Sequence, residues 1–148
     1  MDGYRAGASG RGLGPRAFIL RPGVVAGLAA AALDVGWILD VRGDGFSARD
    51  WFVAVVLALA AVAGIAGTAF EIPRVQGVAL AWASGSLLSV GALSLSSIGL
   101  PLLAAGGVAA AAMLATVGYA APRRTIVAVG IALLASFAVV YAGVALTR

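Results

Sequence analysis

The fold is decided by residues 75–122, VQGVALAWASGSLLSVGALSLSSIGLPLLAAGGVAAAAMLATVGYAAP, which contain no charged side chain. A transmembrane helix needs about 20 consecutive apolar residues, so this stretch is long enough for two membrane spans and a turn. Gly99 and Pro101 mark the turn, because glycine commonly follows the end of a helix and proline favours the start of the next one. We therefore predict a hairpin of two transmembrane helices, over residues 76–98 and 100–120.

Three further apolar segments surround this hairpin, at residues 22–39, 50–70 and 125–146. The hydrophobic fraction of 62% and the mean hydropathy of +1.06 exceed what a soluble domain can carry, because a soluble fold presents a largely polar exterior. A chain of 148 residues leaves no room for a separate soluble domain. We predict an all-α, polytopic integral membrane bundle of five transmembrane helices, with residues 22–148 as one domain.

Residues 1–21 form a basic leader that is rich in glycine and arginine. Such a segment has little apolar surface to bury, so we expect a disordered tail attracted to anionic lipid headgroups. Pro22 is then expected at the first position of the first helix, where a backbone donor is not needed. This region also resembles a signal peptide, but the apolar stretch continues to Leu39 and contains Asp34, which favours a helix that is retained.

The arginines indicate an orientation, because short cytoplasmic loops carry an excess of basic residues. With the N-terminus inside, seven of the ten are cytoplasmic: Arg5, Arg11, Arg16, Arg21, Arg74, Arg123 and Arg124. Arg42, Arg49 and Arg148 are then outside. We expect an N-in, C-out protein of a prokaryotic plasma membrane.

The composition excludes several kinds of chemistry. The chain contains no cysteine and no histidine, which removes thiol redox chemistry, histidine-ligated haem and the usual zinc ligands. The net charge of +4 comes from arginines scattered over tails and loops, without the basic stripe of a nucleic-acid-binding surface. We expect no cofactor, no metal, no catalytic residue and no nucleic acid, and we expect the lipid bilayer as the main partner.

The connection before the second span ends in Ser47, Ala48, Arg49 and Asp50. Serine followed three residues later by an acidic residue has the pattern of a capping box, in which each side chain accepts a hydrogen bond from the other residue's backbone. We predict that this box begins the second helix.

Small residues recur at intervals of four in three of the predicted helices. Such ridges let helix backbones approach closely, either within the chain or in a complex with a second copy or another membrane protein. The three ridges are Gly77, Ala81, Gly85 and Ser89 in the third span, Gly23 and Gly27 in the first, and Gly107, Ala111 and Ala115 in the fourth. We expect the first of these to be buried against another helix.

Asp34 is the residue whose transfer into the membrane costs the most free energy, because an acid at the bilayer centre costs about 2.5–3.5 kcal/mol on insertion scales. It lies five residues before Leu39, roughly 8 Å from the helix end at 1.5 Å per residue. Tyr141 and Ser94 are expected at a similar depth, so we predict that Asp34 faces the interior and bonds one of them. Arg49 could also reach it from the loop.

Serine hydroxyls follow one face of the third span, at Ser86, Ser89 and Ser97. They either bond carbonyl groups of their own helix or line a polar path. Two hypotheses follow for the whole protein. The first is a non-enzymatic packing or accessory subunit, and the alternative is a small oligomeric transporter or channel that uses Asp34 and the serine face.

Overall fold

The computed structural model describes residues 15–41, 45, 47–69, 72–95, 99–118 and 121–147, and within α1 it describes side chains from residue 22 to residue 40. These ranges contain five helices: α1 (Pro15–Val41), α2 (Ala48–Ala69), α3 (Pro73–Leu93), α4 (Gly99–Val117) and α5 (Arg123–Leu146). Each helix is long and apolar enough to cross a membrane. Over these ranges the predicted all-α fold is confirmed, and so is the prediction of five helices that are able to span a membrane.

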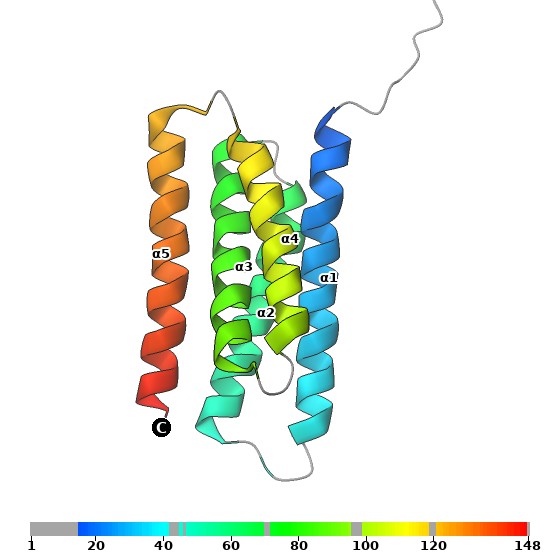
Figure 1. Cartoon of the computed structure of the whole chain (residues 1–148), viewed down its shortest axis with the longest axis vertical. Helices are drawn as coiled ribbons and strands as arrows, with labels where there is room; N and C mark the ends of the chain where they lie inside the picture. The colour runs from blue at the N-terminus through cyan, green and yellow to red at the C-terminus, as the bar shows by residue number, and fades with distance from the viewer. Residues whose placement is uncertain are drawn as a thin grey trace, which may run out of the picture.

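The helices run up and down alternately, and the first four form a bundle (Figure 1). In this bundle α1 packs against α2 and α4, and α3 packs against the same two helices from the other side. α5 lies outside the bundle, mainly on α3, with a smaller contact to α2. Consequently 61% of the α3 span is buried but only 17% of the α5 span, so α3 is the central helix and α5 is largely left to the lipid.

A layer of apolar side chains closes the middle of the four-helix bundle. Leu57 of α2, Leu87 of α3 and Leu102 of α4 are all completely buried and pack in one cluster with Ala30 of α1. Because lipid is as apolar as these side chains, the layer stabilises the bundle through close packing rather than through removal of water.

Glycines bring α1 and α2 into direct backbone contact. A Cβ atom at Gly27 would lie 2.9 Å from the carbonyl oxygen of Ala61, and a Cβ atom at Gly64 would lie 3.1 Å from the Cα atom of Gly27. A Cβ atom at Gly23 would lie 3.5 Å from the carbonyl oxygen of Gly64. The Gly23 and Gly27 ridge therefore packs within the chain, against the face of α2 that carries Gly64. The sequence did not indicate this face, because α2 is apolar on all sides.

The predicted ridge on α3 is also buried, and its partner is α5. Gly77, Ala81, Gly85 and Ser89 are all buried. A Cβ atom at Gly77 would lie 3.0 Å from Val129, and one at Gly85 would overlap the hydroxyl group of Ser136. The expectation that this ridge faces another helix is confirmed.

The third ridge, on α4, faces outward. Gly107, Ala111 and Ala115 are exposed, and a Cβ atom at Gly107 would have no neighbour within 4 Å. This ridge therefore does not contribute to packing within the described chain.

The turn between α3 and α4 differs from the prediction. α3 ends at Leu93 instead of residue 98, and Gly99 is the first residue of α4 rather than the end of α3. Ser94 is the C-cap, with φ −114° and ψ 28°, and both its backbone N–H and its hydroxyl group donate to the carbonyl oxygen of Val90, at 3.0 and 2.6 Å. The Gly99 N–H then donates to the Ser94 carbonyl at 2.8 Å, and a Cβ atom at Gly99 would lie 2.7 Å from that group. Glycine is therefore required by the close approach of the two helix ends.

The start of α1 is a second correction. The helix begins at Pro15, and Pro22, predicted at its first position, lies inside it. Pro15 instead occupies the helix start, where a missing backbone N–H costs nothing. Residues 15–21, predicted to be disordered, are thus helical, and the predicted tail over residues 1–14 lies outside the described residues. The stretch apolar enough to span a membrane still begins at Pro22 and runs to Asp40.

Candidate polar site at one end of the bundle

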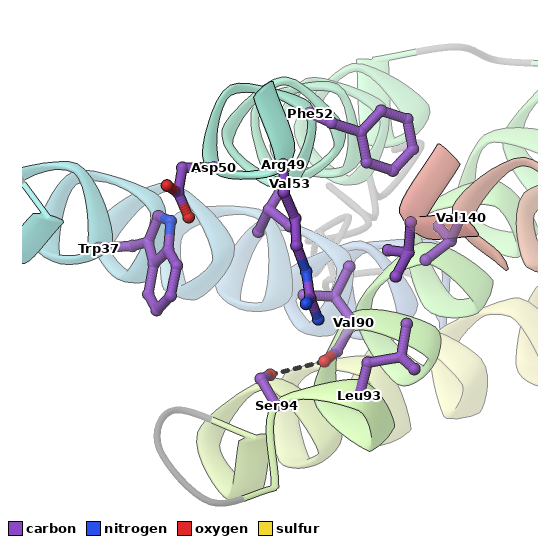
Figure 2. Close-up of a pocket in the computed structure, with 10 residues that line it drawn as sticks. Trp37, Arg49, Asp50, Phe52, Val53, Val90, Leu93, Ser94 and Val140 are labelled. Carbon is purple, nitrogen blue, oxygen red and sulfur yellow. Dashed lines mark hydrogen bonds between the residues drawn. The ribbon is translucent and has the colours of Figure 1, made fainter. Parts of the chain in front are cut away.

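A pocket of about 310 Å³ lies at the end of the bundle that carries the C-terminus (Figures 1 and 2). Four helices contribute to its walls, with α1, α2, α3 and α5 each supplying at least one side chain. Its lining residues are Trp37, Arg49, Asp50, Phe52, Val53, Val90, Leu93, Ser94, Val140 and Val144. The pocket therefore combines an apolar wall with a few polar groups, as small-molecule sites do.

The capping box at the start of α2 fixes one side of the pocket. The Ser47 hydroxyl group donates to Asp50 Oδ2 at 2.6 Å, and the Ser47 backbone N–H donates to the same oxygen at 3.0 Å. In return the Asp50 backbone N–H donates to the Ser47 hydroxyl at 3.2 Å. The predicted capping box is confirmed, and it holds the Asp50 carboxylate at the rim of the pocket.

Arg49 extends from this capped end across the pocket. In Figure 2 its guanidinium group points toward α3, at Val90 and Ser94. Arg49 is an exposed side chain, and within the described part of the chain its guanidinium group has no hydrogen bond or ion pair to a protein group. The nearby Asp50 carboxylate is its electrostatic neighbour, without direct contact. Arg49 therefore brings several N–H donors into the pocket that the described residues leave without an acceptor.

Trp37 supplies a second donor to the same pocket. Its indole Nε1 atom is fully buried and has no hydrogen-bond partner among the described residues. Figure 2 shows the nitrogen on the side of the ring that faces Asp50. A buried donor without an acceptor costs roughly 1–3 kcal/mol, so this arrangement does not serve stability alone.

Asp34 lies one helical turn deeper than Trp37 on the same side of α1. It is 7% exposed, and its Oδ1 atom is buried without a hydrogen-bond partner in the described ranges. The prediction that Asp34 faces the protein interior is confirmed. Neither predicted partner bonds this Oδ1 atom: Tyr141 of α5 is 51% exposed, and the Ser94 hydroxyl donates to the Val90 carbonyl. The prediction rested on depth alone, and depth does not specify which side of a helix faces which neighbour.

The serine face of α3 is only partly available as a polar path. Ser89 donates to the Gly85 carbonyl at 2.7 Å, and Ser84 donates to the Ala81 carbonyl at 3.1 Å. Ser86 is completely buried, and its hydroxyl oxygen has no partner in the described structure. Ser97 lies outside the described residues. Of the described serines on this face, Ser86 is therefore the one whose hydroxyl is not already bonded within its own helix.

Sequence reasoning did not recognise Arg49 and Trp37 as members of one site. The available signals were the position of Arg49 inside the capping box and the spacing of Trp37 three residues after Asp34, which places both on one face of α1. No group of three or more acidic side chains in the described ranges could hold a metal ion. Comparison with protein-family models, with curated proteins and with solved structures finds no match for this chain.

Proposed function

We propose that this protein is a non-enzymatic, multi-pass protein of the plasma membrane that works by packing, as an accessory subunit of a membrane complex. The observation that supports this proposal is the apolar layer of Leu57, Leu87 and Leu102 across the bundle interior. A solute crossing between the helices would need polar groups or water along its route, and this layer supplies neither.

The test is purification of the full chain in a mild detergent, followed by mass spectrometry of the intact complex. An accessory subunit is expected to elute with a second membrane protein in a fixed ratio that survives a high-salt wash. A chain that elutes alone or only with copies of itself contradicts the proposal.

The orientation proposed with this function is N-in and C-out, on the basis of the arginine distribution. Because the chain contains no cysteine, single cysteines report topology directly. Asp44→Cys is expected to react with a membrane-impermeant maleimide on intact cells, and Pro122→Cys only after the cells are permeabilised. The reverse pattern of labelling would show that the orientation is wrong.

The alternative function is a small transporter, and one observation favours it. Asp34 is a buried carboxyl group inside a predicted span, and its Oδ1 atom has no partner among the described residues. Intramembrane acids often mark proton or cation pathways. If the parent protein in proteoliposomes carries a pH-dependent flux that Asp34→Asn abolishes while the fold is retained, the transporter replaces the packing subunit.

A further inference from the structure

The pocket at the C-terminal end of the bundle contains two donors that protein groups do not satisfy. Trp37 Nε1 is buried without a hydrogen-bond partner among the described residues, and the exposed Arg49 side chain has no ion pair with any of them. The two side chains come from different helices, α1 and α2, and line the same pocket. Both side chains can therefore donate hydrogen bonds to an acceptor that enters the pocket.

The walls of the pocket specify the rest of the ligand. Six of its lining side chains are apolar: Phe52, Val53, Val90, Leu93, Val140 and Val144. A pocket of about 310 Å³ is at the lower end of the range for small-molecule sites. It has room for a headgroup and the first part of one chain, so the ligand that fits is a small amphiphile.

Asp50 limits the charge of that ligand. Its Oδ2 atom already accepts two hydrogen bonds from Ser47, so the carboxylate belongs to the helix cap and stays beside Arg49. The charges of Asp50 and Arg49 balance each other, so a ligand with two negative charges would meet more repulsion from Asp50 than a ligand with one.

We propose that this pocket binds an amphiphile with one singly charged oxyanion. The oxyanion accepts hydrogen bonds from Arg49 and from the Trp37 indole, and the chain lies against the apolar wall. Two sources carry this chemistry, namely a free carboxylate with a single chain and the phosphodiester headgroup of an anionic lipid. This site goes beyond a packing role, because an accessory subunit needs no ligand of its own.

The experiment uses the full chain in nanodiscs of phosphatidylcholine, with Trp51→Phe and Trp82→Phe so that Trp37 is the only indole. The probe is 2-bromodecanoic acid at pH 8, where the carboxyl group is ionised, because its bromine lies beside the headgroup and quenches indole fluorescence on contact. The neutral comparison is 2-bromodecan-1-ol. We expect the acid to quench Trp37 with saturation, at a concentration at least tenfold lower than the alcohol requires.

Arg49→Gln removes the charge and leaves a shorter, polar side chain. It is expected to raise the half-saturating concentration of the acid by about ten- to a hundredfold, the effect of losing a hydrogen bond to a charged group. Arg74→Gln is the matched control, because Arg74 is an exposed arginine at the opposite end of the bundle. Val53→Phe fills the pocket and is expected to weaken binding without touching the charge, and circular dichroism checks that each variant is folded.

A version that retains only Trp51 measures simple partition into the bilayer, because Trp51 is exposed. Its quenching is expected to rise in proportion to the probe concentration without saturation.

The proposal is overturned if acid and alcohol quench Trp37 alike, if Trp37 shows the same unsaturable quenching as Trp51, or if a folded Arg49→Gln variant behaves like Arg74→Gln. Phosphatidylglycerol in the nanodisc distinguishes the two sources: competition with the acid assigns the site to a lipid headgroup, and undiminished binding assigns it to a free amphiphile.

Discussion

The two ends of the bundle are held together differently. Near Gly23, Gly27 and Gly64, α1 and α2 touch backbone to backbone, and no side chain separates them. At the other end the helices are separated by a pocket, and Trp37 and Arg49 are among the residues that line it. Close packing drives helix association in lipid. The glycine end therefore contributes more to stability than the pocket end, where the helices are packed less closely. The difference indicates that the pocket end has a role other than stabilising the fold.

Gly27→Leu is expected to have the largest effect, because it forces a side chain into the backbone of α2. The Cβ atom alone would lie 2.9 Å from the Ala61 carbonyl oxygen, which cannot move without moving the helix. We expect a loss of about 3 kcal/mol, at the upper end for overpacking, measured by thermal unfolding in detergent. Gly36→Leu on the same helix is the control, since its Cβ atom would meet nothing within 4 Å. Equal melting of the two variants would mean that the glycine end is not the stable end.

Gly85→Leu tests the contact between α3 and α5 and is expected to cost about 1–3 kcal/mol. A Cβ atom there would overlap the Ser136 hydroxyl group, which can rotate away, but would also lie 3.2 Å from the Leu133 carbonyl oxygen. Gly130→Leu on α5 is the control, because that position has open space. α5 has the smallest buried share of the five spans, so a fall in melting temperature with α1 to α4 still folded would locate the damage at α5. Parent-like stability of Gly85→Leu would show that α5 does not pack on this ridge.

Asp34→Ala should have the smallest effect and tests the pocket end of the comparison. A buried carboxyl oxygen without a partner is unfavourable, so its removal offsets the loss of packing. We expect a change in the free energy of unfolding of about 1 kcal/mol or less, from thermal melts of the same preparation. A clear destabilisation beyond that value would mean that Asp34 holds the helices together, and the contrast between the two ends would fail. Asp34→Asn, which keeps the size of the side chain, controls for the cavity.

Much of the fold could be predicted from hydrophobic length, because each span had to be long enough to cross a bilayer. The capping box of Ser47 and Asp50 and the burial of Gly85 also followed from local spacing. The helix ends were less predictable. α3 stops at Leu93, where Ser94 forms the C-cap and Gly99 packs against the end of the helix, and neither contact is encoded in hydropathy.

The candidate site was only partly predictable for the same reason. Asp34 stood out because placing an acid in a membrane costs free energy. Its burial was predicted from that cost and is observed. Its proposed contact with Tyr141 failed because depth in the membrane does not determine the rotation of a helix, and Tyr141 faces outward on α5. Arg49 was predicted only as a residue that could reach Asp34 from the loop, and its place in one pocket with Trp37 was not predicted.

The sequence by itself determined that this chain forms five apolar helices, since the length and composition of each segment leave no other way to satisfy its backbone in lipid. The tertiary structure decided which helices touch. Small residues occur on three helices, yet α1 and α3 bury their ridges and α4 exposes Gly107, because each helix can present only one side to the bundle. It also decided that Arg49 and Trp37 share a pocket, because residues of different helices meet only through the rotation and pairing of those helices.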